Sequence, residues 1–205
     1  MKIVIATRNR HKAVELQTLL HGAGYDAVQL DEIDPDGKIP EVEETGTTFK
    51  ENALLKAQAI AKATGLPAIG DDTGLEVDAL GGAPGIFSAR YSGENCTYED
   101  NVKKLLRELS DVADDRRTAH FKTVAVYVHK ETELSAEGVV EGVITEKAEG
   151  VGGFGYDPVF SVLDMKKTYA QLADEEKNRV SHRGKAIRSL IEKLRENGLI
   201  ADNPS

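Results

Sequence analysis

The start of the chain places a short apolar run, a polar turn and an amphipathic pattern in succession, and this order constrains the fold most. Ile3–Ala6 is a run of four apolar residues, which is typical of a buried strand. After the polar residues Thr7–Asn9, apolar residues recur at helical spacing at Ala13, Leu16, Leu19 and Leu20. Strand, turn and helix predict an α/β fold. Ligands of open α/β sheets bind at the carboxyl ends of strands, so position alone makes Thr7–Lys12 a candidate site.

Composition limits the partners. The 205 residues carry 26 Lys+Arg against 35 Asp+Glu, a net charge of −9, and 40% are apolar. We expect a single domain over residues 1–205, with two lobes but no separable linker. An acidic chain is not expected to bind nucleic acid broadly, although it can still have a local cationic pocket for a small anion.

No run approaches the roughly 20 apolar residues of a membrane span, and no signal peptide is indicated. The single Cys96 excludes internal disulfides and favours a reducing, cytoplasmic location.

Two aspartates are expected at the end of a short strand. Thr48–Glu51 has the pattern of a capping box that opens a helix, after an acidic loop at Asp31–Thr45. Gly65 ends that helix, and a brief strand over Ala68–Gly70 then delivers Asp71 and Asp72. Adjacent carboxylates repel unless a cation lies near them, and Mg²⁺ prefers such oxygen ligands. From the residues alone, a role in a turn or as a helix cap is the simpler explanation of the pair. The nearby Glu41, Glu43 and Glu44 are either solvated or complete a metal site.

The second half supplies a helix, a hairpin, a glycine-rich loop and a last helix. Thr97 caps a helix, and two alternating strands over Ala119–His129 and Glu137–Ile144 indicate a long hairpin. Gly150–Gly155 satisfies the G-x-G-x-x-G pattern, but a turn and a strand at Pro158–Val162 follow where a dinucleotide site needs a helix. Phe154, with glycines on both sides, fits either a flexible turn or a platform for stacking a base.

Basic residues gather where the last helix is expected to begin, near Ser181. Lys177, His182, Arg183 and Lys185 lie within nine residues of an otherwise acidic chain. Such residues are commonly solvated. At a helix start they also combine with backbone N–H groups to bind an anion or a carbonyl oxygen.

Five blocks in this order resemble the inosine/xanthosine triphosphate pyrophosphatase family, over Lys2 to about Leu194. They are IATRNRHK (Ile5–Lys12), EETGTTFKENALLKA (Glu43–Ala57), PAIGDDTGLEVDALGGAPGIFSARYSG (Pro67–Gly93), GGFGYDPVF (Gly152–Phe160) and EEKNRVSHRGKA (Glu175–Ala186). The resemblance implies an α/β fold with a mixed, curved central sheet, helical lobes around it and the nucleotide in a cleft between them. It also implies a homodimer and Mg²⁺-dependent hydrolysis of ITP, dITP or XTP to the monophosphate and pyrophosphate.

The resemblance further implies a role for each matching residue. Asp72 would be the general base and a Mg²⁺ contact, with Glu44, or else Glu41, as a second carboxylate. The triphosphate would be bound by the opening block, chiefly Asn9 and Lys12, in the set Thr7, Arg8, Asn9, Arg10, His11 and Lys12. Thr73 would also touch the substrate. Phe154 would stack on the purine, Gly155, Tyr156 and Asp157 would shape the pocket, and Lys177, His182 and Arg183 would read the base.

Two positions depart from the family pattern. Arg8 stands where the family usually has glycine, which leaves the backbone path over the phosphates open, and Thr73 replaces the commoner serine. Lys177 and Arg183 fit a 6-oxopurine because they can only donate hydrogen bonds, whereas adenine presents an amino group at this position. Two other functions remain as alternatives: a pyrophosphatase of another modified nucleotide and a nucleotide-binding module without turnover. A general phosphatase is a third, and it would release orthophosphate.

Overall fold

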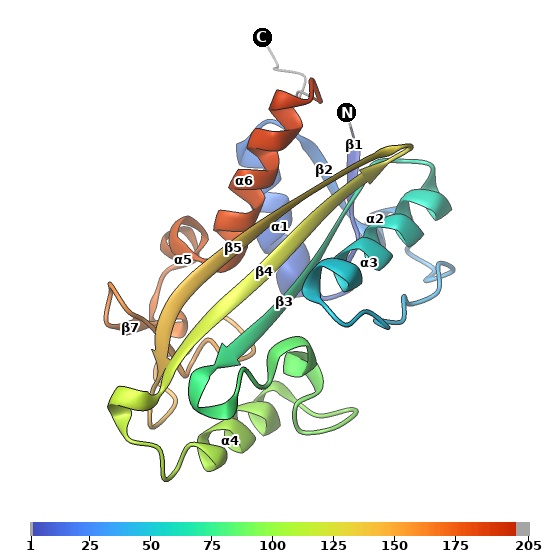
Figure 1. The fold of residues 1–205 in the computed structure, drawn as a ribbon. Helices are drawn as coiled ribbons and strands as arrows, with labels where there is room; N and C mark the ends of the chain where they lie inside the picture. Colours follow the sequence, from blue (N-terminus) through green and yellow to red (C-terminus); the bar gives the residue numbers. More distant parts are fainter. Residues whose placement is uncertain (1, 200–205) are drawn as a thin grey trace. The chain divides into compact units, whose positions relative to one another are not determined.

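Within residues 2–199, which the computed structural model describes, seven strands form one mixed sheet in the order β2-β1-β3-β4-β5-β6-β7 (Figure 1). The strands are β1 (Lys2–Ile5), β2 (Asp26–Gln29), β3 (Ala68–Val77), β4 (Thr118–His129), β5 (Thr132–Ile144), β6 (Phe160–Val162) and β7 (Lys167–Thr168). β1 is parallel to both β2 and β3, whereas β6 is antiparallel to β5 and β7. The expected α/β class with a mixed sheet is therefore confirmed.

The helices are α1 (Arg10–Gly22), α2 (Leu30–Ile33), α3 (Phe49–Thr64), α4 (Tyr98–Glu108), α5 (Asp174–Val180) and α6 (His182–Glu196). Helices α1, α3 and α4 begin after side chains that cap them. The side chain of Asn9 caps α1 by accepting a hydrogen bond from the Lys12 N–H. The expected capping box of Thr48 and Glu51 opens α3, and Gly65, at φ 70°, ends it because a left-handed residue suits glycine.

By the density of its internal contacts the chain divides into two compact units, and each is described by itself. Unit 1 holds the chain up to Asp72, Thr123–Gly138 and the chain from Arg183 onward; unit 2 holds Thr73–Lys122 and Val139–His182. β3, β4 and β5 each contribute residues to both units.

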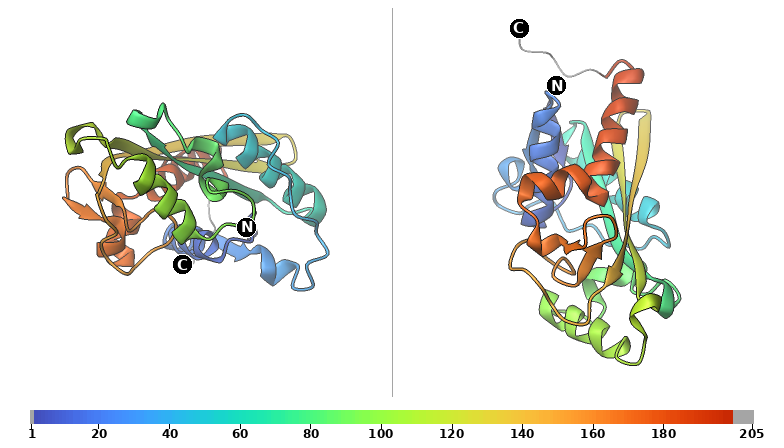
Figure 2. Two further views of the ribbon diagram at one scale, coloured as in Figure 1. Left: turned by 90° about the horizontal axis from the view of Figure 1, so that it is seen from below. Right: turned by 90° about the vertical axis from the view of Figure 1, so that its left-hand side faces the viewer.

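The core of unit 1 follows from strand alternation. Ile3 and Ile5 of β1 pack in one apolar cluster with α1 and α6, where Leu16 and Leu190 are buried. Val4, between them in β1, belongs to a second cluster with Ile60 of α3. Successive strand residues face opposite ways, so α1 and α6 cover one face of this part of the sheet and α3 covers the other (Figure 2).

Unit 2 has its own apolar core. Leu75 and Val77 of β3, Leu105 of α4 and Phe160 of β6 are buried together with Tyr169. None of the helices in residues 2–199 is long and apolar enough to cross a membrane.

Several elements differ from the sequence expectation. β3 does not stop at Gly70 but runs on to Val77, so Asp71 and Asp72 lie inside a strand and not at its end. The expectation was wrong because two carboxylates conceal the alternation that Leu75 and Val77 continue. β2, α5 and β7 were not expected, and the one-turn α2 lies within the expected acidic loop. These elements are too short for periodicity to reveal them. β5 begins at Thr132 instead of Glu137, and β6 only at Phe160.

Candidate functional site

A close approach between α3 and β3 at Gly70 assembles the first part of the site. A Cβ atom at position 70 would lie 2.3 Å from the Ala53 carbonyl oxygen and 2.9 Å from the Ala57 nitrogen, so only glycine fits. The contact brings side chains of α3 to the strand residues that follow. Asn52 Nδ2 donates to Asp72 Oδ2 at 3.2 Å, and Lys56 Nζ lies 3.6 Å from Asp72 Oδ1.

Asp72 is a buried carboxyl group whose surroundings make it more basic. Burial raises its pKa most, the charge of Glu44 adds to the rise, and Lys56 and Lys12 oppose it without cancelling it. Lys56 Nζ also forms an ion pair with Glu44 Oε1 at 2.8 Å, so both carboxylates converge on one ammonium group. A basic carboxylate at a partly polar site is suited to accept a proton from water.

Asp71 has the opposite electrostatic state. Burial alone would raise its pKa, but Lys12, Arg183 and Lys56 together hold that pKa well below its usual range. Lys12 Nζ lies 3.4 Å from Asp71 Oδ2, and Arg183 Nε donates to the same oxygen at 3.2 Å. Strand alternation points neighbouring side chains to opposite faces, which is why Asp71 meets side chains of α1 and α6 while Asp72 meets α3.

Lys12 and Arg183 are held by this buried ionic network. Burial lowers the pKa of Lys12 and outweighs the raising effect of Asp71. Arg183 NH1 also pairs with Glu15 Oε2 of α1. The resemblance implied that Arg183 reads the base; its guanidinium here contacts two carboxylates of unit 1, and base reading by Arg183 remains a prediction.

The opening block forms the turn into α1. The Asn9 N–H donates to Thr7 Oγ1 at 3.1 Å, and the Lys12 N–H donates to Asn9 Oδ1 at 3.2 Å. Arg10 and His11 are exposed in the first turn of the helix. The first N–H groups of a helix favour anions, and Lys12 adds a positive charge in the same first turn of α1. We call Lys12, Glu44, Asn52, Lys56, Asp71 and Asp72 the unit 1 site.

The unit 1 site fits Mg²⁺ that arrives with a phosphate substrate. Asp72 and Glu44 offer hard oxygen donors around a single positive charge, that of Lys56. In the part of the chain that the structure describes, no group of three or more His, Cys, Asp or Glu residues could hold a metal by itself. Protein-bound Mg²⁺ commonly uses one or two carboxylates and completes its shell with water and substrate phosphates. Glu41, the alternative carboxylate, is exposed.

A second group of predicted residues meets in unit 2 around Asp157. Its Oδ2 atom accepts hydrogen bonds from the Phe154 N–H at 2.8 Å and from Lys177 Nζ at 2.7 Å. Lys177 Nζ thereby lies 4.8 Å from the centroid of the Phe154 ring. Gly153 has φ 72°, and a Cβ there would come within 2.1 Å of the Asp157 carboxylate, so the loop closes on Asp157 only with glycine.

Aromatic packing fixes the neighbouring residues of unit 2. The buried His182 ring stacks on Phe121 with centroids 4.5 Å apart, and its Nδ1 lies 3.4 Å from the Tyr169 hydroxyl oxygen. The Tyr156 hydroxyl donates to the Ser88 carbonyl at 2.9 Å and is buried, so Tyr156 anchors the glycine-rich loop to the core. We call Phe154, Asp157, Lys177 and His182 the unit 2 site.

Sequence reasoning missed Asn52, Lys56 and Glu15. Asn52 lies in the buried stripe of α3 and Lys56 follows it by one helical turn, so both occupy one face of the helix. A polar residue inside an apolar stripe was the available signal. Nothing in the sequence links Glu15 to Arg183, which is 168 positions away.

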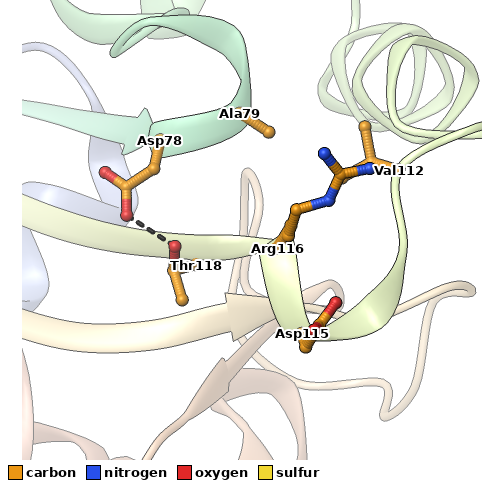
Figure 3. Close-up of a pocket in the computed structure, with 6 residues that line it drawn as sticks. All are labelled: Asp78, Ala79, Val112, Asp115, Arg116 and Thr118. Carbon is orange, nitrogen blue, oxygen red and sulfur yellow. Dashed lines mark hydrogen bonds between the residues drawn. The ribbon is translucent and has the colours of Figure 1, made fainter.

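A surface hollow in unit 2 carries none of the predicted residues (Figure 3). Asp78, Ala79, Val112, Asp115, Arg116 and Thr118 line it. The Thr118 hydroxyl donates to Asp78 Oδ2 at 2.6 Å, which ties two of these polar groups to each other. We assign the hollow no function.

The chain belongs to the Ham1 family, whose model matches residues 3–193. A dITP/XTP pyrophosphatase of Salmonella typhimurium is 54% identical over 197 residues, which cover 95% of this chain and 98% of the relative. That of Escherichia coli (strain K12) is 52% identical with the same coverage. The solved Ham1 protein of Staphylococcus aureus superposes with a TM-score of 0.83 at 42% identity, covering 96% of this chain and all (100%) of that one. The dITP/XTP pyrophosphatase of Mycobacterium abscessus gives 0.72 at 42% identity, with 93% and 99% covered. The resemblance seen in the sequence is confirmed.

Proposed function

We propose that this protein hydrolyses the non-standard purine nucleoside triphosphates dITP, ITP and XTP to the monophosphate and pyrophosphate. One observation carries the proposal: of two adjacent buried aspartates, Asp71 is held ionised by Lys12 and Arg183, while Asp72 is made basic beside Glu44. A module that only bound nucleotides would need no such basic carboxylate. The names of the relatives, which cover nearly all of this chain, point to the same reaction.

The unit 1 site binds the triphosphate and carries out the chemistry. The N–H groups at the start of α1 and the Lys12 ammonium bind phosphate oxygens. The remaining predicted contacts with the triphosphate come from the opening block, at Thr7, Arg10 and His11, and from Thr73 in the block Pro67–Gly93. Asp72 and Glu44 would hold Mg²⁺, which neutralises phosphate charge and polarises the phosphoryl group when bound.

Asp72 takes a proton from the attacking water. The water oxygen bonds to the α-phosphorus, the bond from that phosphorus to the bridging oxygen breaks, and pyrophosphate leaves with the electron pair. Asn52 donates a hydrogen bond to Asp72 Oδ2, which turns the other oxygen, Oδ1, toward the Lys56 side. Lys56 keeps Glu44 and Asp72 near each other despite their like charges.

The unit 2 site recognises the base. Phe154 stacks on the purine, and Lys177, held over its ring by Asp157, donates to the 6-oxo group. Lysine has no acceptor, so the amino group of adenine would face a donor and lose its partner. Sites built on such hydrogen bonds reject the wrong ligand by about 10⁴–10⁵. Gly155 and Tyr156 shape the loop, and His182 is a second candidate donor.

The test is a substrate panel with Mg²⁺ that measures pyrophosphate and orthophosphate separately. Pyrophosphate from ITP, dITP and XTP with little from ATP is the expected result, and GTP tests recognition at the 2-position. Release of orthophosphate alone would indicate a general phosphatase. Preference for a modified pyrimidine would favour a pyrophosphatase of another nucleotide. Binding without turnover would leave a nucleotide-binding module. A homodimer, a single-domain organisation and a cytoplasmic location remain predictions.

A further inference from the structure

Arg8, which stands where the family usually has glycine, makes its hydrogen bonds to the acidic loop at Asp31–Thr45. Its NH2 donates to Asp34 Oδ2 at 2.7 Å and to the Ile39 carbonyl at 3.0 Å. NH1 donates to Asp31 Oδ1, at the start of the loop, at 3.0 Å. The guanidinium therefore joins the turn after β1 to a segment 23 to 31 residues further along the chain.

The Asp34 carboxylate is held in place for its hydrogen bond with Arg8. The side chain is buried, at 7% exposed, and its two oxygens also accept the N–H groups of Lys38, at 2.8 Å, and Ile39, at 2.9 Å. Burial alone would raise its pKa, but hydrogen bonds from Ile39, Arg8 and Lys38 outweigh that effect and lower it. One carboxylate thus closes the turn over residues 34–39 and ties it to Arg8.

The acidic loop leads from this anchor directly to Glu44. Residues 40–46 form neither helix nor strand, so regular hydrogen bonding does not fix their path. Two polar side-chain anchors hold the loop: Asp34 and the Ile39 carbonyl on Arg8, and Glu44 on Lys56 at 2.8 Å. Ile39 also packs against the apolar cluster that contains Ile60. Loss of Arg8 removes the polar anchor near the start of the loop and leaves the path from Ile39 to Glu44 less constrained.

We propose that Arg8 is a positioning residue that clamps the acidic loop, through Asp34, so that Glu44 stays beside Asp72. The inference rests on the proposed function, because the consequence of misplacing Glu44 is weaker binding of the Mg²⁺ that the two carboxylates would share. Arg8 then acts on the reaction through Glu44 and not as a ligand of the triphosphate.

Two variants distinguish the clamp from a phosphate ligand. Removal of the guanidinium in Arg8→Ala would weaken activity under either assignment. Asp34→Asn keeps Arg8 and its ion pair with Asp31 and removes the charge of the buried partner. A phosphate ligand freed from the Asp34 charge would bind the nucleotide equally well or better, which would leave KM unchanged or lower it. The clamp predicts that both variants raise the Mg²⁺ concentration for half-maximal activity, by roughly 10-fold as for other supports of metal ligands. The double variant is expected to be no worse than either single one.

Amide hydrogen exchange without metal or nucleotide supplies a readout that does not depend on activity. Faster exchange of the Lys38 and Ile39 N–H groups and of the N–H groups of residues 41–44 is expected in both variants, with Arg8→Lys giving partial rescue. Lys38→Ala is the matched control, because that side chain is exposed and forms an ion pair with the equally exposed Asp36. Unchanged exchange in both variants, or Asp34→Asn with normal Mg²⁺ dependence, would overturn the clamp. A wild-type protein that releases no pyrophosphate would refute the proposed function alone, since the exchange comparison would still decide the clamp.

Discussion

Asp71 and Asp72 are neighbours in β3, and their surroundings shift their pKa values in opposite directions. Both side chains are buried, at 1% and 5% exposed. Asp71 contacts the cations Lys12 and Arg183, whereas Asp72 faces Lys56 and Asn52 together with the charge of Glu44. Two carboxyl groups whose pKa values are driven apart commonly divide structural and chemical roles.

Asp72→Asn is expected to abolish turnover and leave the fold intact. A general base contributes about 10²–10⁴ in rate, so kcat for ITP should fall by at least that factor. Asparagine keeps the shape and carries no charge that burial penalises, so Tm should stay the same or rise. Pyrophosphate release and thermal unfolding measure the two effects. Substantial turnover in the folded variant would remove Asp72 from the role of base.

Asp71→Asn is the matched variant and should act mainly on stability. It leaves Lys12 and Arg183 as buried charges without their shared carboxylate, and breaking a buried pair of this kind costs about 3–5 kcal/mol. The pKa of Asp71 is lower in the folded state than in the unfolded state. Its ionised form therefore stabilises the fold above about pH 4, and this contribution is lost as the pH falls through the folded pKa. Urea unfolding from pH 3 to 7 should show less acid sensitivity in the variant. Equal stability at pH 7 would contradict the structural role.

In the metal-free protein, the titration of the Asp72 carboxyl group should show its basic character. The group is expected to ionise above the ordinary aspartate pKa of about 3.9, because burial and the charge of Glu44 raise its pKa. Glu44→Gln removes a charge that raises this pKa and should move the titration to lower pH. Lys56→Met removes a charge that lowers this pKa and should move the titration to higher pH. Carboxyl-carbon NMR shifts recorded without metal measure both changes, and shifts in the same direction for both variants would contradict the assigned surroundings of Asp72.

Phe154→Ala should weaken nucleotide binding through the loss of base stacking. By analogy with stacking in nucleic-acid binders the loss is about 1–3 kcal/mol, which would appear chiefly in KM for ITP. Phe87→Ala is the control, since Phe87 is an exposed phenylalanine that lies outside both sites. An unchanged KM in Phe154→Ala, or an equal change in the control, would place the base elsewhere.

Local sequence patterns predicted the helices around the unit 1 site more accurately than they predicted β3, the strand that contains Asp71 and Asp72. The caps at Thr48 and Thr97 were visible because a capping residue interacts with a residue three positions away, whereas the cap at Asn9 was found only in the structure. The continuation of β3 past Gly70 was missed, since acidic residues at positions 71 and 72 resemble the end of a strand. The two buried carboxylates are stabilised by Lys12, Lys56 and Arg183, which lie in helices α1, α3 and α6.

The sequence by itself determined the α/β class, the main helices and the family, because these depend on periodicity, on capping residues and on motifs in a fixed order. It also supplied the residue types of both sites. Only the tertiary structure decided which aspartate is basic, that Asn52 and Lys56 support it, and that Arg8 contacts Asp34. The physical reason is that a pKa and a buried ion pair depend on neighbours brought together by packing, such as Arg183 and Asp71, which are 112 positions apart.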